Sequence, residues 1–259
     1  MPKLYQNQLL CPKQIGCIEG PYNVGGRTRA LAMDVQDENI LFAGGASGGM
    51  FRSTDGGLSW AMTTSPNQLH NVTCVSQDTR IGHEDTWYFG SGELTGSSAS
   101  GGEAYYGGNG IYKSVDGGLS WDSLAVTATN TNGFDSDFDF IWNGKTDPSN
   151  DSLDVVYAAV YSAIYRSENG GNSWTKVLGG GSAYYTNVEV TSTGVVYATL
   201  SSDGTDKGIW RSLDGQNWTD ITDSLFTPVY GRIAIGVNPG DEDEVYFLAA
   251  ETDGYGQHT

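Results

Sequence analysis

A short turn motif occurs four times in this chain, and it constrains the fold more than any other feature of the sequence. Three copies read Ser-x-Asp/Asn-Gly-Gly-x-Ser-Trp, at residues 53–60, 114–121 and 167–174. A fourth copy, at residues 212–218, is one residue shorter. Repetition at this scale indicates stacked supersecondary units. The chain is therefore predicted to be a repeat array.

Each residue type in the motif suits a tight hairpin. Asp, Asn and Ser side chains can accept hydrogen bonds from backbone N–H groups of their own turn, and Gly adopts the positive φ that such turns need. A Trp that folds back over the turn buries a large apolar area, so we expect all four tryptophans to be largely buried. The predicted structural residues are Ser53, Asp55, Gly57 and Trp60; Ser114, Asp116, Gly118 and Trp121; Ser167, Asn169, Gly171 and Trp174; and Ser212, Asp214 and Trp218.

Strand-like stretches precede every copy of the motif, at residues 49–52, 110–113, 163–166 and 208–211. Each interval between copies holds four strand-like runs. The 37 glycines fall at regular places between these runs, and no window shows a sustained apolar period of 3.6 residues. The sequence predicts an all-β protein with almost no helix.

With these motifs the chain resembles the Asp-box (BNR-repeat) β-propellers. That group includes sialidases, xyloglucan-hydrolysing glycosidases, sortilin-type receptors and a photosystem II assembly factor. The stretch Pro-Tyr-Asn-Val-Gly-Gly-Arg-Thr-Arg-Ala-Leu-Ala-Met-Asp at 21–34, continued by the Gly-rich run 43–49, is most similar to large secreted repeat proteins of Bacteroidota. The resemblance covers about residues 20–254. It implies a propeller of four-stranded antiparallel blades, with four complete blades and two strands of a fifth.

The expected organisation is an N-terminal extension, 1–22, followed by a propeller domain, 23–259. The blades are predicted at about 23–65, 66–130, 131–182 and 183–224, with a partial blade at 225–259. No further third strand and box follow residue 254. Since proteins avoid bare sheet edges, we expect a C-terminally truncated piece of a longer propeller; the alternative is that other domains or chains complete the ring.

Charge and hydropathy exclude several classes of partner. The chain has 31 acidic and 13 basic residues, a net charge of −18, which argues against binding nucleic acid or an anionic membrane. No apolar run is long enough for a transmembrane helix, and the first residues do not form a signal peptide. Because the resemblance implies a secreted or cell-surface protein, this sequence is interpreted as a mature form or a fragment.

Metal and disulfide chemistry have few candidates. The acidic runs 135–139 and 241–244 are rich in the oxygen ligands that calcium accepts, but neither has the spacing of a known calcium loop. No cofactor is therefore predicted, with calcium as the alternative. Cys11 and Cys17 are close enough in sequence to form a disulfide, whereas Cys74 lies on a predicted strand and is expected to be a small buried residue.

The binding face is expected opposite the turn motifs. The resemblance implies that the innermost strand of each blade lines a central channel and that ligands bind near the channel on the face without boxes. The longest insertion on that face is 93–109, in which Tyr105 and Tyr106 offer flat faces to a sugar ring and Glu93 and Glu103 can bind hydroxyls. The alternative is an ordered Gly-rich lid. Around the same mouth we place Arg27, Asp135, Asp137, Asp139, Tyr184, Tyr185, Tyr230 and Arg232.

Catalysis is not predicted with any named residue. Xyloglucan-hydrolysing propellers carry an Asp shortly before the Gly-Gly of the first blade's third strand, and Ala46, which cannot act as a base, stands there in this chain. The favoured function is an extracellular or cell-surface module that binds a glycan or protein partner, or a scaffold in a larger secreted protein. The alternatives are a glycoside hydrolase acting on a polysaccharide at the channel mouth and an assembly factor.

Overall fold

The structure is a computed structural model and describes residues 26–97, 103–131 and 133–250. The predicted extension 1–22, with Cys11 and Cys17, lies outside the described residues. The side chains of Glu103 and Tyr105 also lie outside them, although the backbone of both residues is described. What the sequence predicts for these residues stays a prediction.

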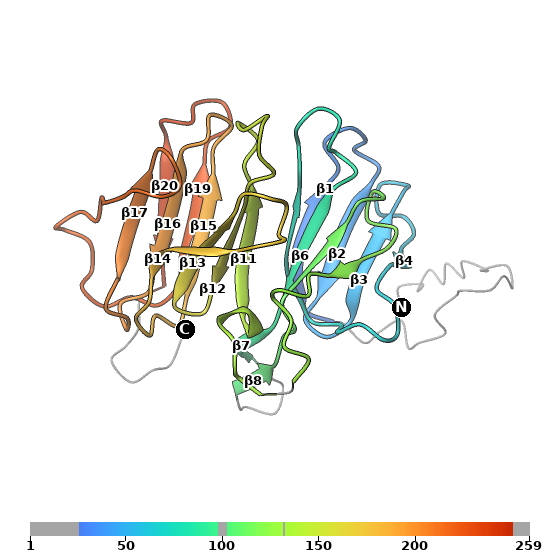
Figure 1. The fold of residues 1–259 in the computed structure, drawn as a ribbon, viewed down its shortest axis with the longest axis horizontal. Coiled ribbons are helices and arrows are strands. Elements are labelled where there is room, and N and C mark those ends of the chain that lie inside the picture. The colour runs from blue at the N-terminus through green and yellow to red at the C-terminus, as the bar shows by residue number, and fades with distance from the viewer. Residues whose placement is uncertain (1–25, 98–102, 132, 251–259) are drawn as a thin grey trace, which may run out of the picture.

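Four antiparallel four-stranded sheets make up most of the described chain (Figure 1). Two strands of a fifth sheet follow, and one additional hairpin projects from the second sheet. This confirms the prediction of four complete blades and two strands of a fifth. The strands are β1 (Thr28–Met33), β2 (Leu41–Gly45), β3 (Gly49–Ser53) and β4 (Ala61–Met62); β5 (Val72–Gln77), β6 (Trp87–Ser91), β9 (Ile111–Ser114) and β10 (Asp122–Ser123); β11 (Ile141–Thr146), β12 (Val156–Val160), β13 (Ala163–Ser167) and β14 (Thr175–Gly179); β15 (Thr186–Val190), β16 (Val196–Leu200), β17 (Gly208–Ser212) and β18 (Trp218–Asp220); β19 (Ile233–Val237) and β20 (Val245–Ala249); and the hairpin β7 (Glu93–Ser97) and β8 (Glu103–Tyr106).

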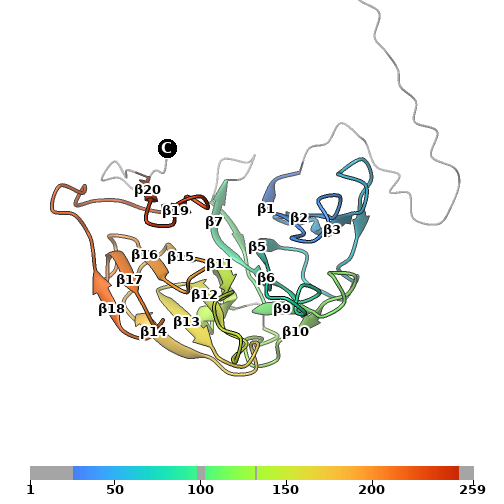
Figure 2. The same ribbon diagram turned by 90° about the horizontal axis from the view of Figure 1, so that it is seen from above.

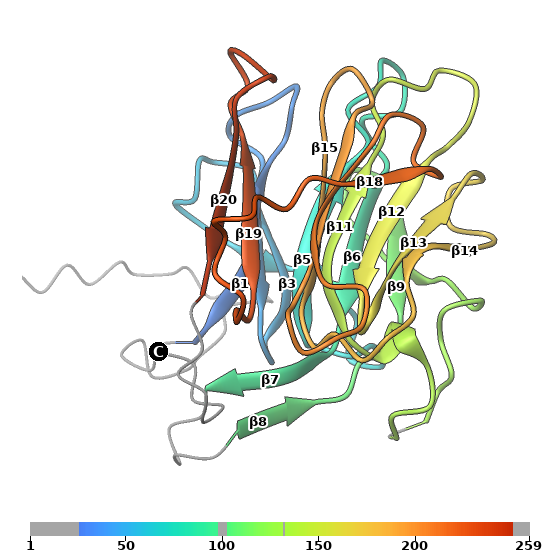
Figure 3. The ribbon, with the colours of Figure 1, turned by 90° about the vertical axis from the view of Figure 1, so that its left-hand side faces the viewer.

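The blades stand side by side in an arc (Figure 2). The first strand of each blade, β1, β5, β11, β15 or β19, lies on the concave side of this arc. Viewed from the side, hairpin β7–β8 lies beyond one end of the sheets (Figure 3). The concave side and this end of it are therefore where the predicted channel mouth has to be sought.

The apolar cores lie between neighbouring blades. Between the first two blades, the Phe42 ring is 4.3 Å from Trp87, and both side chains are fully buried. Gly44 allows strand β2 to lie close to β5, because a Cβ at that position would lie 2.4 Å from Cγ1 of Val72. Equivalent clusters form between the second and third blades and between the third and fourth. Blade-to-blade packing of this kind holds a repeat array together.

The four turn motifs have the predicted hydrogen bonds. In the first, Oγ of Ser53 accepts from the N–H of Gly57 at 2.9 Å, and Oδ1 of Asp55 accepts from the N–H of Ser59 at 2.8 Å. Asp116, Asn169 and Asp214 accept backbone N–H bonds in the same way, at 3.0, 2.9 and 2.7 Å. The motif therefore closes the hairpin between the third and fourth strands of each complete blade.

The prediction that all four motif tryptophans are largely buried is wrong for Trp60. Trp121 is 4% exposed and Trp60 is 40% exposed, while Trp174 and Trp218 are half-buried. Trp121 packs onto the preceding blade, with its ring 6.3 Å from Phe42 and its Nε1 donating to Thr63. Trp60 belongs to the first blade, and no blade precedes it among the described residues.

Three local details differ from the expected strand pattern. The insertion 93–109, expected as a loop, forms hairpin β7–β8. The outer strands β4 and β10 have two residues each, shorter than expected, as is common for sheet edges. The third blade starts late because Ser136 caps a 3-10 turn, Asp137–Asp139, that delays the start of β11.

Bulges recur near the start of the innermost strands. The register of β1 with β2 skips Arg29, that of β5 with β6 skips Thr73, and that of β11 with β12 skips Trp142. A bulge re-aims the side chain of its extra residue. In the first blade that residue is an arginine, and it points toward the site described below.

Candidate functional site at the channel mouth

The innermost strands all begin at the same end of the concave side, which we call the channel mouth. Arg27 precedes β1, Tyr185 precedes β15 and Arg232 precedes β19. Strand β6 runs antiparallel to β5 and so ends at the mouth, where it leads into hairpin β7–β8. The fold thus brings Arg27, Glu93, Tyr185 and Arg232, which are far apart in sequence, to one end of the arc.

The centre of the mouth is a carboxylate held by two arginines. Glu93 is 2% exposed, and Nη1 of Arg27 donates to its Oε1 at 2.7 Å while Nη2 binds Oε2. Nε of Arg29 lies 3.2 Å from the same Oε1. We call these three residues the arginine clamp. The hydrogen bonds to Glu93 raise the pKa of Arg27, and a two-pronged pair of this kind fixes both side chains.

The base of hairpin β7–β8 positions Glu93. Gly92 has φ +90°, and a Cβ there would lie 1.8 Å from the carbonyl oxygen of Asp139. The N–H of Gly108 donates to that oxygen at 3.0 Å, and Nδ2 of Asn71 donates to the carbonyl of Gly107 at 2.6 Å. The hairpin is therefore anchored on the 3-10 turn, and Glu93 starts from a rigid base.

Two of the mouth's guanidinium groups have incomplete partners. Nε of Arg29 is buried and makes no hydrogen bond, because its approach to Glu93 lacks the required geometry. The Arg232 side chain is half-buried and makes no hydrogen bond or ion pair with the described residues. Burial lowers the pKa of Arg232, the positive charge of Arg29 lowers it further, and Tyr185 and Glu93 act in the opposite sense. Among the described residues, the three guanidinium groups of Arg27, Arg29 and Arg232 therefore act on one carboxylate, that of Glu93.

Three neighbouring aromatic rings lie on the segments that precede β11, follow β12 and precede β15. Phe134 is 49% exposed and Tyr184 is 46% exposed, and Tyr161 lies between them with ring centroids 4.9 and 5.8 Å away. We call these three residues the aromatic strip. Tyr185 packs on Trp142 at 4.8 Å. Sequence reasoning named Tyr184 and Tyr185 but missed Phe134 and Tyr161, since neither lies in the insertion or in a motif.

Several predicted mouth residues make structural contacts instead. Asp137 accepts from the Tyr165 hydroxyl at 2.9 Å and pairs with Lys176 at 3.2 Å, within the third blade. Asp139 is fully buried; its Oδ2 accepts two backbone N–H bonds, and burial raises its pKa. Tyr230 is 4% exposed in the core of the last blades. Tyr106 lies opposite Glu93 in the hairpin and is half-buried.

In the part of the chain that the structure describes, the acidic runs 135–139 and 241–244 do not form a group of potential metal ligands. Asp135, Asp137 and Asp139 each have a different partner, and Glu242 and Glu244 bind Ser192 and Asn238. Among the described residues, Asp78, His83 and Asp154 have potential ligand atoms within 4.8 Å of one another. Arg80 lies between these acids, with Nη2 2.7 Å from Asp154. This cluster therefore joins the second and third blades through a guanidinium.

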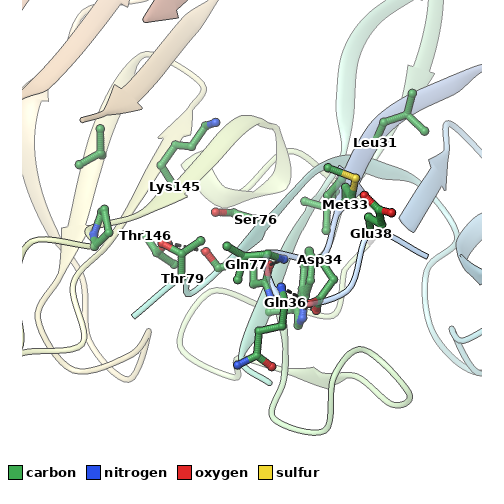
Figure 4. Close-up of a pocket in the computed structure, with 16 residues that line it drawn as sticks. Leu31, Met33, Asp34, Gln36, Glu38, Ser76, Gln77, Thr79, Lys145 and Thr146 are labelled. Carbon is green, nitrogen blue, oxygen red and sulfur yellow. Dashed lines mark hydrogen bonds between the residues drawn. The ribbon is translucent and has the colours of Figure 1, made fainter. Parts of the chain in front are cut away.

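A hollow of about 820 Å³ lies at the opposite end of the innermost strands (Figure 4). Its walls include the last residues of β1, β5 and β11, with Met33, Gln77 and Lys145 among them. The polar groups there are largely paired: Gln77 donates to Asp34 at 2.9 Å, and Lys145 pairs with Glu189 at 3.0 Å. Sequence reasoning did not predict this hollow, and the arginine clamp lies at the other end of the innermost strands.

Known proteins share the architecture. The structure matches an ancestral GH74 enzyme with a TM-score of 0.63 at 20% identity, covering 88% of this chain and 29% of that one. It matches the GH74 xyloglucanase of Xanthomonas campestris with a TM-score of 0.56 at 18% identity (86% and 35% covered). It also matches a chain of a nidogen/laminin complex with a TM-score of 0.55 at 12% identity (87% and 73%). The chain forms part of a β-propeller.

Sequence comparison points to similar propellers. Xyloglucanases of Hypocrea jecorina (strain QM6a) and of a Paenibacillus species are each 26% identical to the chain, over 231 and 228 residues. The matches cover 74% of this propeller chain but only 26% and 21% of the two xyloglucanases. The chain thus spans about a quarter of the length of these curated relatives. No family model matches it. In the described residues, no helix is long and apolar enough to cross a membrane.

Proposed function

We propose that this chain is an extracellular polysaccharide-binding propeller module whose binding surface is the channel mouth. The observation that carries the proposal is the aromatic strip, in which Phe134 and Tyr184 are each about half exposed and are linked through the ring of Tyr161. The C–H face of a sugar ring is apolar and packs on such rings. Exposed aromatic patches with a polar surround are typical of ligand-binding surfaces.

The polar groups of the arginine clamp suit sugar hydroxyls. Arg27 is partly exposed, with its guanidinium fixed by Glu93, so its remaining N–H groups are held in one orientation. Preorganised donors bind at a smaller entropic cost than flexible ones. The two curated relatives are named xyloglucanases, and xyloglucan is a polysaccharide, which supports a carbohydrate ligand for this chain. Because polysaccharides are met outside the cell, we place the protein there.

A glycoside hydrolase is the second candidate, favoured by the names of those same relatives. Three of the carboxylates predicted for the mouth argue for binding without turnover. Both oxygens of Glu93 are held by Arg27, Asp137 pairs with Lys176, and Asp139 is buried. A catalytic acid has to reach the glycosidic oxygen, and none of these three is oriented to do so.

Calorimetric titration of the chain with xyloglucan, other β-glucan and pectic oligosaccharides tests the proposal. We expect binding to at least one, weakened about tenfold or more by the Phe134→Ala/Tyr184→Ala double substitution, which corresponds to roughly 1.4 kcal/mol or more. The matched control is Tyr246→Ala, which removes an exposed tyrosine from β20, near the other end of the strands. Unaltered binding in the double variant would refute the assignment. Release of reducing ends from the bound oligosaccharide would favour the hydrolase.

A further inference from the structure

We propose that the fourth and fifth sheets form a docking surface for a β-hairpin of a partner protein that carries the same turn motif as the first four blades. Tyr197 and Arg211 of the fourth sheet would hold the turn of this hairpin, and strand β20 of the fifth sheet would pair with its first strand. This surface is separate from the channel mouth and does not depend on the polysaccharide-binding function.

Inside the array, a basic side chain on the third strand of a blade binds the turn motif of the next blade. Nε of Arg52, on β3, donates to the carbonyl oxygen of Gly117 in the second motif at 2.9 Å. Nζ of Lys113, on β9, donates to the carbonyl oxygen of Gly170 in the third motif at 3.3 Å, and the Tyr88 hydroxyl donates to the same oxygen at 3.3 Å. Gly117 and Gly170 are the first glycines of their motifs, so the two contacts are equivalent.

The fourth motif lies against the third blade in the same way. Arg166 and Tyr157 stand opposite each other on β13 and β12, and Nε of Arg166 donates to the Tyr157 hydroxyl at 3.1 Å. A Cβ at Gly215, the first glycine of the fourth motif, would lie 1.8 Å from that hydroxyl oxygen and 3.1 Å from Nε of Arg166. At all three junctions between complete blades, a motif turn therefore lies on a basic side chain of the preceding blade.

The fourth blade has the same pair of side chains, but no motif turn lies on it among the described residues. Arg211 and Tyr197 stand opposite each other on β17 and β16, with Nε of Arg211 3.4 Å from the Tyr197 hydroxyl oxygen. Within the described ranges, this is the single hydrogen bond of the Arg211 side chain. The other N–H groups of its guanidinium are therefore available to the carbonyl of a turn.

Strand β20 lacks the partner strand that its counterparts have. In each complete blade the second strand pairs with the third, whereas β20 pairs only with β19 among the described strands. Tyr246 is the second residue of its strand, as Tyr157 and Tyr197 are of theirs, but it is 66% exposed while they are 1% and 8% exposed. An unpaired edge is a template for another strand. The incoming strand would place a basic residue opposite Tyr246, as Arg166 lies opposite Tyr157.

A hairpin with the turn motif is the occupant that satisfies both features at once. In every complete blade the motif begins at the last residue of the third strand, so a strand paired with β20 leads directly into a turn. The repeat of the blades then brings that turn onto Arg211. A second copy of this chain could cover β20 through its own β20, but no motif follows that strand in residues 250–259, and Arg211 would remain without a turn.

The probe is a synthetic peptide with the sequence of residues 163–179, which contains β13, the third motif and β14. Fluorescence anisotropy measures its binding to the 259-residue chain, and hydrogen–deuterium exchange measures the protection of β20. We expect saturable binding, slower exchange of the β20 amides, and binding weakened about tenfold or more by Arg211→Gln. The matched control is Arg52→Gln, which removes the same group from a position that the second motif already covers and should leave binding unchanged.

A second peptide separates recognition of the turn from pairing with the edge. It carries Gly170→Ala and Gly171→Ala, and because both glycines have positive φ, it keeps the strands but not the turn. We expect it to bind about tenfold more weakly or worse. Equal binding of the two peptides would overturn the proposal, since it would assign the edge to any extended chain.

A fused version keeps the test valid if the free peptide does not fold, because an isolated hairpin is marginally stable. Residues 163–179 are joined after residue 259, so that 250–259 form the connection, as 201–207 do between β16 and β17. Slower exchange of β20 in the fused chain, reversed by Arg211→Gln, would support the docking surface. Unchanged exchange of β20 with both the peptide and the fusion would overturn it. So would a dimer of the unfused chain, seen by sedimentation velocity, in which β20 is already protected.

Discussion

Truncation of two equivalent tryptophans should have unequal effects on stability. Trp60 and Trp121 occupy the same position of the turn motif, and each donates one hydrogen bond from Nε1, to the carbonyl of Gly57 at 3.0 Å and to Thr63 at 2.9 Å. The hydrogen-bond contribution is therefore matched. Burial is not, because Trp121 is 4% exposed and Trp60 is 40% exposed.

The difference in burial sets the magnitude. A tryptophan side chain buries about 200 Å², so the two differ by ~70 Å², or about 2 kcal/mol at roughly 25 cal/mol per Å². Trp121→Ala also leaves a cavity beside Phe42 and Phe89, whose rings contact it. We expect Trp121→Ala to lower the free energy of unfolding by about 3–5 kcal/mol. Trp60→Ala should lower it by about 2 kcal/mol less.

Urea unfolding followed by far-ultraviolet circular dichroism measures both values, with comparable slopes as the sign that the same unit unfolds. Neither substitution should change ligand affinity, because the motifs lie at the opposite end of the strands from the mouth. Equal losses for the two variants would refute the reasoning that each motif tryptophan is stabilised by the preceding blade.

Two further predictions concern the motif turns. Hydrogen bonds from the Ser59 hydroxyl and N–H lower the pKa of Asp55 from 3.8 to about 2. The stability that Asp55 contributes is therefore present above about pH 4 and lost as the pH falls toward 2. Between about pH 4 and pH 2, the thermal midpoint should fall less steeply in Asp55→Asn than in the unsubstituted chain, and more steeply in Asn169→Asp. Gly118 and Gly82 both have positive φ, but a Cβ would lie 2.3 Å from Phe42 only at Gly118. In urea, Gly118→Ala should therefore destabilise by about 1–3 kcal/mol more than Gly82→Ala, and equal effects would contradict this.

The repeat made the fold readable from the sequence. Gly and Asp at fixed places in the motif specify one hairpin, and the third strands 49–53, 163–167 and 208–212 lie where the lead-in sequences indicated. The burial of the individual motif tryptophans could not be predicted from the sequence. It depends on which blade lies alongside, a tertiary property that the identical motif of Trp60 and Trp121 does not encode.

The site was only partly predictable. A long insertion indicated Glu93, and the order of strands placed Arg27, Tyr185 and Arg232 at one end of the molecule. The position of the Arg29 side chain depends on a bulge that the sequence of its strand does not indicate. The rings of Phe134, Tyr161 and Tyr184 come from three separate segments and come into contact only in the folded structure. Asp137 looked equivalent to the other acids of its run, but Lys176 and Tyr165 hold it within the third blade.

The features proposed for polysaccharide binding are those in which the blades differ. The motif hairpins repeat almost unchanged and close each blade at one end. At the other end, Arg29 replaces the structural hydrogen-bonding residues found in the equivalent bulges, and only the second blade inserts a hairpin between its second and third strands among those described. A repeat array needs similar contacts between neighbouring blades, so departures from the repeat that are confined to one end contribute little to that packing. Their convergence on the channel mouth is the physical reason for placing the ligand there.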